Sequence, residues 1–403
     1  MSDIVVSGLG CISASGVGVP AFSHAVLEGV SGASDLIGPR LDTLNVRRAA
    51  QVQGYDAASH FDRRTLAGLD PFAQFALVAA SEAVAMSGLP EDLLAGADTA
   101  VIVGTGVGGV STLDHGSHAV YAENASRVDV QSVPRVMPSA AASQVSMRYR
   151  TTGPSFAVSS ACSSSTQAIG LGMMLIRAGI VKRAIVGGSE ACITYSVMKA
   201  WEALRVMTPD LCRPFSLGRN GMMLGEGAGI FVLERESDVR ARGGKTHARL
   251  RGYGTTSDGK DILRPDQAGC AHAMRLALSD AGIEPSQIGY INAHGTGTIV
   301  NDTTESAAIL EVFGAHAQTV PVSSTKPVHG HALGAAGALE LAASIVALQA
   351  QRLPLNLNFS AADPACAVNV VQTASPATID YVLSNSFAFG GVNACLVVGR
   401  GDA

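Results

Sequence analysis

The chain has 403 residues, 45 of them glycine, and only 15% are charged, against about 25% in an average soluble protein. This length allows two domain-sized units around a large core, and a hydrophobic content of 47% excludes a disordered chain. The net charge of −5, without a basic block, gives no footprint for nucleic acid, so we expect no nucleic-acid partner.

Short apolar strands alternate with longer alanine-rich helices along the chain. Ile4–Ser7, Thr99–Val103 and Arg183–Val186 are predicted strands, and Pro71–Met86 and Ser165–Arg177 are predicted helices. Strands that alternate with helices in this way are typical of a layered α/β protein.

The chain carries no sign of secretion or of a membrane anchor. The seven cysteines form no C-x-x-C pair, and the N-terminal segment has no basic region of the kind that starts a signal peptide. The most apolar helical stretches, near 165–181 and 334–350, are interrupted by Arg177 and Glu340 and fall short of about 18–20 uninterrupted apolar residues. We expect a soluble, cytoplasmic protein with reduced thiols and no membrane partner.

Two pairs of segments repeat in the same order. Phe75–Gly106 resembles Ala273–Gly297, because each has an alanine-rich helix, a strand and a turn of Gly and Thr. Phe156–Ser160 then resembles Val320–Ser324, and each leads into a helix of small residues. Matched pairs in order predict a duplicated α/β fold.

The join between the two copies is predicted at Arg240–Thr246, a polar hinge that contains two glycines. The predicted halves are 1–246 and 247–403. The stretches 109–140 and 196–222 interrupt the repeat and are rich in Pro, Met and Arg. We interpret them as insertions that cover a pocket or pair subunits.

Cys162 is the first candidate for chemistry. It follows the predicted strand Phe156–Ser160 and begins a helix, where free N–H groups and the positive helix end favour a thiolate. A cysteine placed there is a candidate nucleophile for acyl transfer, and its own N–H can help to bind an oxyanion. The alternative, a small buried hydrophobe, fits the other six cysteines better.

Two histidines stand at comparable turns. His294 follows the strand-like Tyr290–Ala293 and precedes Gly295, and His331 lies in the loop 326–337, the internal counterpart of the Cys162 turn. A lone histidine is more often structural, but pseudo-symmetry would bring both turns to the centre of the molecule. Near the C-terminus, the glycine-rich turn 384–393 offers a second oxyanion donor.

A catalytic metal is not expected. His329 with His331, and His115 with His118, have spacings that a metal could use. Neither pair has an accompanying set of Cys, His or carboxylate ligands nearby in the sequence.

Four segments together carry a family resemblance: Ser159–Ser163 around Cys162, Asn292–Thr298, Ser323–Gly337 and Asn385–Asn393. They resemble the elongating β-ketoacyl-acyl carrier protein synthases of the thiolase superfamily, almost from end to end. The stretch Trp201–Leu233 is similar to the second type of synthase and to its relatives in nodulation-factor and polyene pathways. The resemblance implies a thiolase-like fold, a duplicated five-layer αβαβα arrangement.

For the reaction, the resemblance implies an acyltransferase. Cys162 would take an acyl chain from acyl-acyl carrier protein, and a decarboxylative Claisen condensation with malonyl-acyl carrier protein would give 3-oxoacyl-acyl carrier protein in fatty-acid or polyketide-type elongation. His294 and His331 would bind the malonyl thioester carbonyl and stabilise the enolate. Lys326 would order the site.

The resemblance also assigns roles around this centre. The N–H groups of Cys162 and Phe389 would form the oxyanion hole, with the Phe389 ring as a gate to the acyl pocket. The residues with other implied roles are Thr296 and Thr298, which would bind the phosphopantetheine arm; Val107 and Val136, which would line the acyl pocket; and Glu305, Glu340 and Asn385, which would support the site.

No cofactor is implied beyond the phosphopantetheine of the carrier protein, although the resemblance allows a structural monovalent cation at Asn292, Glu340, Ser384 and Asn385. Three positions depart from the family pattern. Pro327 follows the lysine, His329 adds a histidine, and Ala388 stands where glycine is usual, which restricts the gate.

The implied partners are acyl carrier protein and a second synthase-like subunit, in a homodimer or in a heterodimer with a chain-length partner. Arg63, Arg64 and Lys199 are candidates for carrier docking. An alternative function is that of the non-catalytic chain-length partner itself, but such partners lack the nucleophile, and Cys162 is present. A degradative thiolase using Cys395 as a second cysteine fits less well, because the thiolase glycine pattern around Cys395 is missing.

Overall fold

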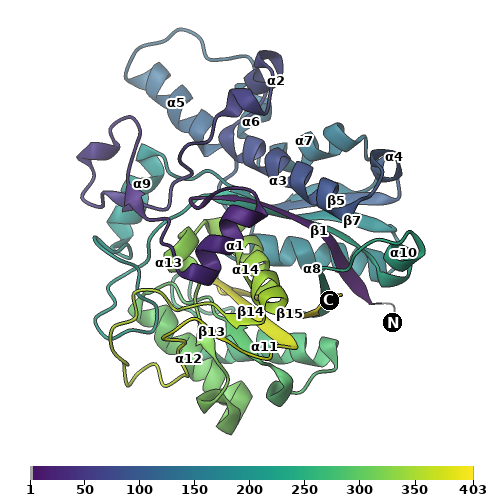
Figure 1. Cartoon of the computed structure of the whole chain (residues 1–403). Helices are drawn as coiled ribbons and strands as arrows, with labels where there is room; N and C mark the ends of the chain where they lie inside the picture. The colour runs from purple at the N-terminus through teal and green to yellow at the C-terminus, as the bar shows by residue number, and fades with distance from the viewer. Residues whose placement is uncertain (1–2, 403) are drawn as a thin grey trace.

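The computed structural model describes residues 3–402 and is built on one continuous sheet with two similar halves (Figure 1). The first half has the strand order β6-β5-β7-β8-β1 and the second has the order β11-β10-β14-β15-β9. The strands of the first half are β1 (Ile4–Ser13), β5 (Thr99–Gly104), β6 (Ser155–Val158), β7 (Arg183–Glu190) and β8 (Gly227–Arg235). Those of the second are β9 (Ala248–Ser257), β10 (Tyr290–Asn292), β11 (Val322–Ser323), β14 (Tyr381–Ala388) and β15 (Val392–Arg400).

Strand direction repeats as faithfully as strand order. The first two pairings in each half, β5 with β6 and β7, and β10 with β11 and β14, are parallel, and the remaining pairings are antiparallel. β1 and β9 join the halves through a short antiparallel ladder. The sheet therefore confirms the α/β class and the duplication that the internal repeats predict.

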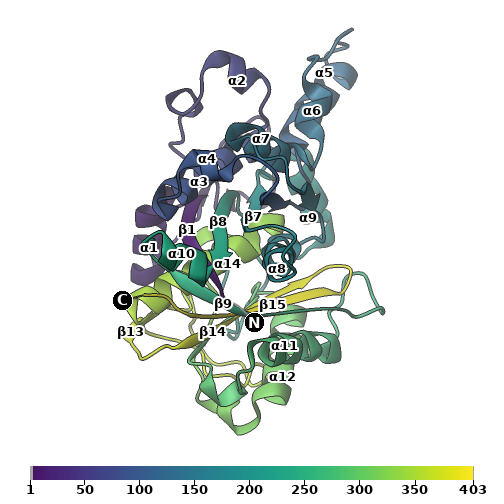
Figure 2. The same ribbon diagram turned by 90° about the vertical axis from the view of Figure 1, so that its right-hand side faces the viewer.

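Helices complete five layers around the two halves of the sheet. The buried helices α8 (Ser164–Arg177) and α14 (Ala336–Ala350) lie in the middle layer, between the two sheet halves (Figure 2). The outer helices are α3 (Pro71–Ser87) and α7 (Ala140–Tyr149) on one side, and α11 (Gln267–Ala281) and α12 (Ile299–Phe313) on the other.

The outer helices α3 and α11 begin and end by the same local chemistry. The carboxylate of Asp70 accepts the N–H of Phe72 at the start of α3, and that of Asp266 accepts the N–H of Gly269 at the start of α11. Each helix then ends at a glycine with a left-handed backbone, Gly88 or Gly282.

Glycines in the strands let these helices lie close to the sheet. A Cβ on Gly10 of β1 would lie 2.0 Å from a carbonyl oxygen of α3, and one on Gly254 of β9 would lie 2.2 Å from a carbonyl oxygen of α11. Only glycine fits at such an approach. This requirement, repeated in both halves, accounts for part of the high glycine content.

The remaining elements are short or lie in the connections. They are β2 (Gly16–Val17), α1 (Val19–Glu28), β3 (Ser34–Asp35), β4 (Arg48–Ala49), α2 (Arg63–Ala67), α4 (Glu91–Leu94), α5 (Val110–Tyr121), α6 (Ser132–Val136), α9 (Tyr195–Leu204), α10 (Glu236–Ala241), α13 (Lys326–His329), β12 (Arg352–Leu353) and β13 (Ser375–Pro376). The stretch 109–140 forms α5 and α6, which project from the body of the molecule (Figure 2).

One stretch of the described residues, Leu333–Ala350, is long and apolar enough to cross a membrane by length and composition alone. Of that stretch, 89% is buried inside the protein, because it contains the middle-layer helix α14. It is a core helix.

Candidate active site

Cys162 stands on a tight turn between β6 and the start of α8. The residue before it, Ala161, has a φ of 49°, which an L-residue seldom adopts. The Ser164 hydroxyl holds this turn, because it accepts the N–H of Ser160 at 2.9 Å and donates to the carbonyl of Ala161 at 2.6 Å. The local strain and its clamp fix the position of the thiol.

The Cys162 sulfur is surrounded by hydrogen-bonding groups. Nε2 of His331 lies 3.1 Å from Sγ, and the backbone N–H groups of Phe389 and of Cys162 itself both face the sulfur. Two N–H groups that converge on one point can bind a negative oxygen formed next to that sulfur.

Burial decides the protonation state of this thiol. It raises the pKa of Cys162 to about 12, although the charge of Lys326 and the two N–H groups act in the opposite direction. The N–H groups at this turn do favour the thiolate, in the direction that the sequence predicts, but desolvation outweighs them. A neutral thiol lies beside His331 until a base removes its proton.

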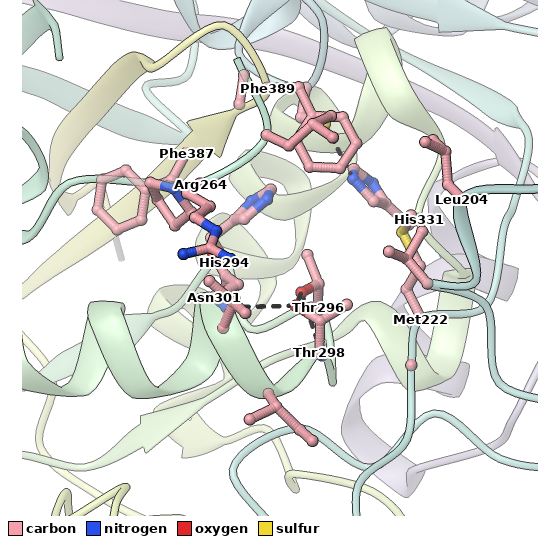
Figure 3. A pocket seen from close by; sticks show the side chains of 18 of the residues that line it. Leu204, Met222, Arg264, His294, Thr296, Thr298, Asn301, His331, Phe387 and Phe389 are labelled. Atoms are coloured by element: carbon pink, nitrogen blue, oxygen red, sulfur yellow. Dashed lines mark hydrogen bonds between the residues drawn. The ribbon is translucent and has the colours of Figure 1, made fainter. Parts of the chain in front are cut away.

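His294 follows β10, and the carboxylate of Glu305 fixes its backbone. The N–H groups of His294 and Gly295 each donate to Glu305 at 2.8 Å. The His294 and His331 rings meet edge to face, with centroids 5.4 Å apart. Figure 3 shows both rings facing the same cavity. Burial, and then the charge of Lys326, hold the pKa of both imidazoles well below the ordinary value, so both are neutral at pH 7.

Lys326 fixes the tautomer of His294. Its ammonium lies 3.2 Å from Nδ1 of His294 and also donates to the carbonyl oxygen of His294. An ammonium can only donate, so Nδ1 accepts and the proton of the imidazole is on Nε2. His294 therefore presents an Nε2–H donor.

A buried ion pair supports this arrangement. Lys326 donates to the carboxylate of Glu340, and both side chains are fully buried. Burial raises the pKa of Glu340 to about 7, and Lys326 acts against that shift. Near Glu340, three buried oxygens have no hydrogen-bond partner among the described residues: Oδ1 of Asn292, Oδ1 of Asn385 and Oε2 of Glu340. Such oxygens, one of them from a carboxylate, suit a small monovalent cation.

His329 is a satisfied core histidine. The carbonyl of Gly330 lies 2.8 Å from Nδ1, and the hydroxyl of Thr325 lies 2.9 Å from Nε2. A carbonyl only accepts, so Nδ1 carries the proton and Nε2 accepts from Thr325. Burial lowers the pKa of His329 to about 3. The extra histidine thus helps to hold the loop that leads to His331.

The donor atoms of Cys162, His294 and His331 lie within 4.8 Å of one another, a spacing that a metal ion could use. The electrostatics do not favour one. The Lys326 ammonium already lies against the imidazole of His294, and the thiol is held protonated by burial. The cluster fits acid–base and hydrogen-bonding chemistry better than metal binding.

A cavity of about 490 Å³ connects this cluster with the surface. Its inner part contains Cys162, His294, His331 and Phe389. The hydroxyls of Thr296 and Thr298, 2.9 Å apart, line its wall (Figure 3). The cavity is also lined by side chains that sequence reasoning missed: the half-buried Trp201, the buried Met222, and the exposed Leu204, Arg205, Leu263, Arg264, Ile299 and Val300. No local motif distinguishes these residues, because they converge only through the tertiary fold.

Val107 and Val136 lie apart from this cavity. Val107 precedes α5 and is 38% exposed, and Val136 ends α6. Neither lines the space around Cys162 within one chain. The same stretch of chain exposes Leu113 on α5, Val133 on α6 and Val130 between the two helices.

Ala388, which stands where the family usually has glycine, ends β14 opposite Val392. Its backbone is not left-handed, so alanine fits there without strain. The docking candidates Arg63 and Arg64 are exposed on α2, and Lys199 pairs with Glu202 at 2.9 Å. None of these three lines the cavity.

Comparison with known families matches two models to this chain. The model described as beta-ketoacyl synthase, N-terminal domain, matches residues 1–239, and the beta-ketoacyl synthase, C-terminal domain, matches residues 247–360. Among curated proteins, nodulation protein E of Rhizobium sp. (strain N33) is 39% identical over 394 residues, which is 98% of each chain. The 3-oxoacyl-[acyl-carrier-protein] synthase 2 of Staphylococcus aureus (strain COL) is 35% identical over 410 residues, 99% of each chain.

Solved structures agree with these matches. A structure described as the ishigamide ketosynthase/chain length factor superposes with a TM-score of 0.95 at 32% identity, over 99% of both chains. A beta-ketoacyl synthase from Burkholderia phymatum STM815 gives a TM-score of 0.92 at 31% identity, over 99% of this chain and 100% of that one. A type II polyketide ketosynthase solved with its acyl-carrier protein, AntDE:AntF, gives 0.91 at 27% identity, over 99% of both chains.

Proposed function

The chain belongs to the β-ketoacyl synthase family and is a 3-oxoacyl-[acyl-carrier-protein] synthase of fatty-acid or polyketide-type elongation, and from this premise we propose how its residues divide the reaction. Cys162 is the acyl acceptor, His331 is its base, and His294 with His331 binds the extender thioester. The observation that carries this proposal is the 3.1 Å contact between His331 Nε2 and the Cys162 sulfur.

In the first half-reaction, the Cys162 sulfur attacks the thioester carbonyl of an acyl carrier protein. His331 Nε2 takes the thiol proton and passes it to the sulfur of the departing phosphopantetheine arm. A new C–S bond forms at Cys162 as the old one breaks, so the carrier leaves as a free thiol. The oxygen of the tetrahedral intermediate lies in the space between the N–H groups of Cys162 and Phe389.

In the second half-reaction, a malonyl thioester occupies the place of the departed arm. Between the half-reactions the proton of neutral His331 moves from Nδ1, which has no hydrogen-bond partner among the described residues, to Nε2. The malonyl thioester oxygen then accepts from Nε2–H of His294 and from Nε2–H of His331, so charge can build on that oxygen as CO₂ leaves. The enolate carbon attacks the acyl carbonyl on Cys162, the C–S bond to Cys162 breaks, and one proton from solvent restores the thiol. Neutral imidazoles suit this step, because they donate without adding a charge that would stabilise the malonyl carboxylate.

Lys326 and its partners position these groups. The ammonium fixes His294 as the Nε2–H tautomer, and the Glu340 carboxylate balances the charge of the ammonium. The Glu305 carboxylate, which accepts the N–H of His294, is itself held by the side-chain amide of Asn385, whose Nδ2 lies 3.1 Å from Oε1. We propose that Asn292, Glu340 and Asn385 can also hold a monovalent cation, in keeping with their oxygens that lack partners. When bound, that cation supplies a positive charge beside Glu340.

The arm that carries each substrate lies along Thr296 and Thr298, and the carrier protein docks at the outer end of the cavity. Two exposed arginines, Arg205 and Arg264, line this end beside the exposed side chains of Ile299 and Val300. A phosphate and an acidic protein surface fit such a rim. The solved complex of a related ketosynthase with its acyl-carrier protein supports this partner.

A second synthase-like subunit covers the β6 edge. β6 ends the sheet order, and its Phe156 is 38% exposed. The helices that contact β6 also expose apolar side chains, Met147 on α7 and Met174 on α8, and Val130 and Val133 are exposed in the stretch 109–140. Such an edge needs a cover. That cover would bring partner residues next to Val107 and Val136, which do not line the Cys162 cavity within one chain. The partner is a second copy or a chain-length subunit, as the ketosynthase/chain length factor relative suggests.

Intact-protein mass spectrometry tests the proposal. Purified protein is mixed with acyl carrier thioesters of several lengths and then with malonyl carrier protein, with Cys162→Ala as control. The proposal expects an acyl adduct on Cys162 that disappears on addition of the malonyl carrier with release of CO₂. An adduct in Cys162→Ala would overturn the assignment of Cys162 as the acyl acceptor. No adduct in the wild type, with or without a partner subunit, would overturn the proposal and favour the non-catalytic chain-length role.

A further inference from the structure

Trp201 contacts the residue that completes the oxyanion hole. The chain contains one tryptophan, and the indole of Trp201 on α9 stacks on the ring of Phe389 with centroids 5.8 Å apart and planes 19° apart. Both side chains are half-buried and line the same cavity. Offset stacking at this distance is attractive beyond the area that it buries.

The Phe389 turn depends on such contacts for its position. Gly390 and Gly391 follow Phe389 with φ values of 85° and 69°, so the backbone on that side is flexible glycine in a left-handed conformation. Two hydrogen bonds tie the turn to the segment beside it: Gly390 N–H donates to the carbonyl of Ile262 at 2.7 Å, and Asp258 N–H donates to the carbonyl of Gly391 at 2.8 Å. Both contacts fall on the glycines, and neither holds the ring of Phe389. The loop holding Ile262 is itself on the surface.

Trp201, in contrast to the glycine turn, is supported by the buried core. The indole packs against the fourth apolar cluster of the core, which includes Met198, Met222 and Leu333. Leu333 lies two positions after His331, so this cluster also lies beneath the catalytic loop. Trp201 therefore connects the Phe389 ring to the part of the core that supports His331.

We propose that Trp201 is a positioning residue for acyl transfer: its stack on Phe389 holds the backbone N–H of Phe389 toward the Cys162 sulfur. The inference rests on the proposed function, in which that N–H binds the oxyanion. The ring and the N–H belong to one residue, so a ring that is held by the core also holds the N–H in place. The N–H then needs no reorganisation when the oxyanion forms.

The test compares acylation rates in four proteins: the wild type, Trp201→Leu, Phe389→Ala and the double variant. Mass spectrometry follows the adduct on Cys162 over time. Trp201→Leu is expected to slow acylation about threefold to tenfold at saturating acyl carrier, with unchanged half-saturation. In the Phe389→Ala background the same substitution is expected to have no further effect, because the stack is already gone.

Two controls separate positioning from general damage. Trp201→Phe retains an aromatic ring at the stack and should restore most of the rate. Tyr55→Leu removes an aromatic ring that stacks on His60 and packs against a different core cluster, and it should leave the rate unchanged. An equal loss in Trp201→Leu with and without the Phe389 ring, or a loss under twofold, would overturn the inference.

Fluorescence tests the contact itself, independently of catalysis. Trp201 is the only tryptophan, so emission reports this site alone. Phe389→Ala should move the emission maximum to longer wavelength in the folded protein, because it uncovers the indole. No shift would show that the stack is absent in solution, even if Cys162 is acylated normally. Failure of wild-type acylation would instead contradict the proposed function.

Discussion

His331 and Cys162 come from different halves of the duplicated fold and are 169 residues apart, yet Nε2 of one lies 3.1 Å from the sulfur of the other. The internal repeat explains this meeting. The Cys162 turn follows β6 and the His331 loop follows β11, which are equivalent strands in the two halves of the sheet. The helices that follow them, α8 and α14, pack side by side in the middle layer.

Cys162→Ala should separate the two half-reactions. It removes the acyl acceptor but leaves both imidazoles and the Lys326–Glu340 pair in place. We expect no condensation but continued release of CO₂ from malonyl carrier protein, measured with labelled malonate. His294→Ala should lower that release about 100-fold to 1,000-fold, since it removes a donor to the developing oxyanion. Equal release from both variants would contradict the assignment of His294.

The raised pKa of Cys162 predicts the pH dependence of alkylation. With a pKa of about 12, the thiol is neutral throughout pH 7–10, and the thiolate fraction rises about tenfold per pH unit. The rate of modification by iodoacetamide, followed by peptide mass spectrometry at Cys162, should rise over this range without levelling. A plateau below pH 8 would indicate a resting thiolate instead.

His329 should make the fold sensitive to acid. Its folded pKa of about 3 lies below the ordinary value, so below about pH 6.5 the unfolded chain binds a proton that the folded protein does not, and stability falls as pH falls. His329→Asn should remove about 1.4 kcal/mol of this loss per pH unit between about pH 6 and 4. Urea unfolding of both proteins at each pH measures it. Parallel curves would show that His329 is not buried in its neutral form.

Removing only one partner of the buried Lys326–Glu340 pair should cost more than removing both. Lys326→Met leaves the Glu340 carboxylate buried without its cation, which typically costs about 3–5 kcal/mol of unfolding free energy. The double variant Lys326→Met/Glu340→Leu should recover part of that loss at pH 8, because it leaves no buried charge. If the double variant is the less stable protein, the pair stabilises the fold by itself.

Charge reversal at Arg205 or Arg264 should weaken docking of the carrier without affecting chemistry. Both side chains are exposed at the cavity mouth, and neither has a part in the proposed chemistry at Cys162. We expect Arg205→Glu and Arg264→Glu to raise KM for acyl carrier protein about tenfold at low salt, with kcat retained and KM for a small acyl pantetheine thioester unchanged. Arg63→Glu, on α2, tests the docking site predicted from sequence. If only Arg63→Glu raises KM for acyl carrier protein, the carrier docks at α2 and not at the rim formed by Arg205 and Arg264.

The catalytic residues could be predicted from the sequence because local patterns mark their positions. Cys162, His294, Lys326 and His331 each follow a strand or begin a helix, and the repeat aligned their turns, so their position at the centre could be predicted. The same patterns could not show how deeply Cys162 is buried. Desolvation depends on which other parts of the chain pack around the sulfur, and here it outweighs the N–H groups that favour the thiolate.

The outer cavity could not be predicted for a similar reason. Trp201 and Phe389 are far apart in sequence, and nothing near either residue indicates the other. Arg205 and Arg264 come from two different connections and meet only at the cavity mouth. Val107 and Val136 could be placed near an acyl pocket only by analogy, and within one chain they lie on an open face.

The position of β15 has a consequence for how the protein is made. It lies between β9 and β14, so it alone links these two strands of the second half-sheet. A ribosome synthesises it after every other described strand, and until it emerges, the turn that carries Phe389 has only one of its two flanking strands. The edge of β9 therefore stays unpaired from its synthesis until β15 is made, more than 130 residues later, and such an edge can pair with another chain in the meantime.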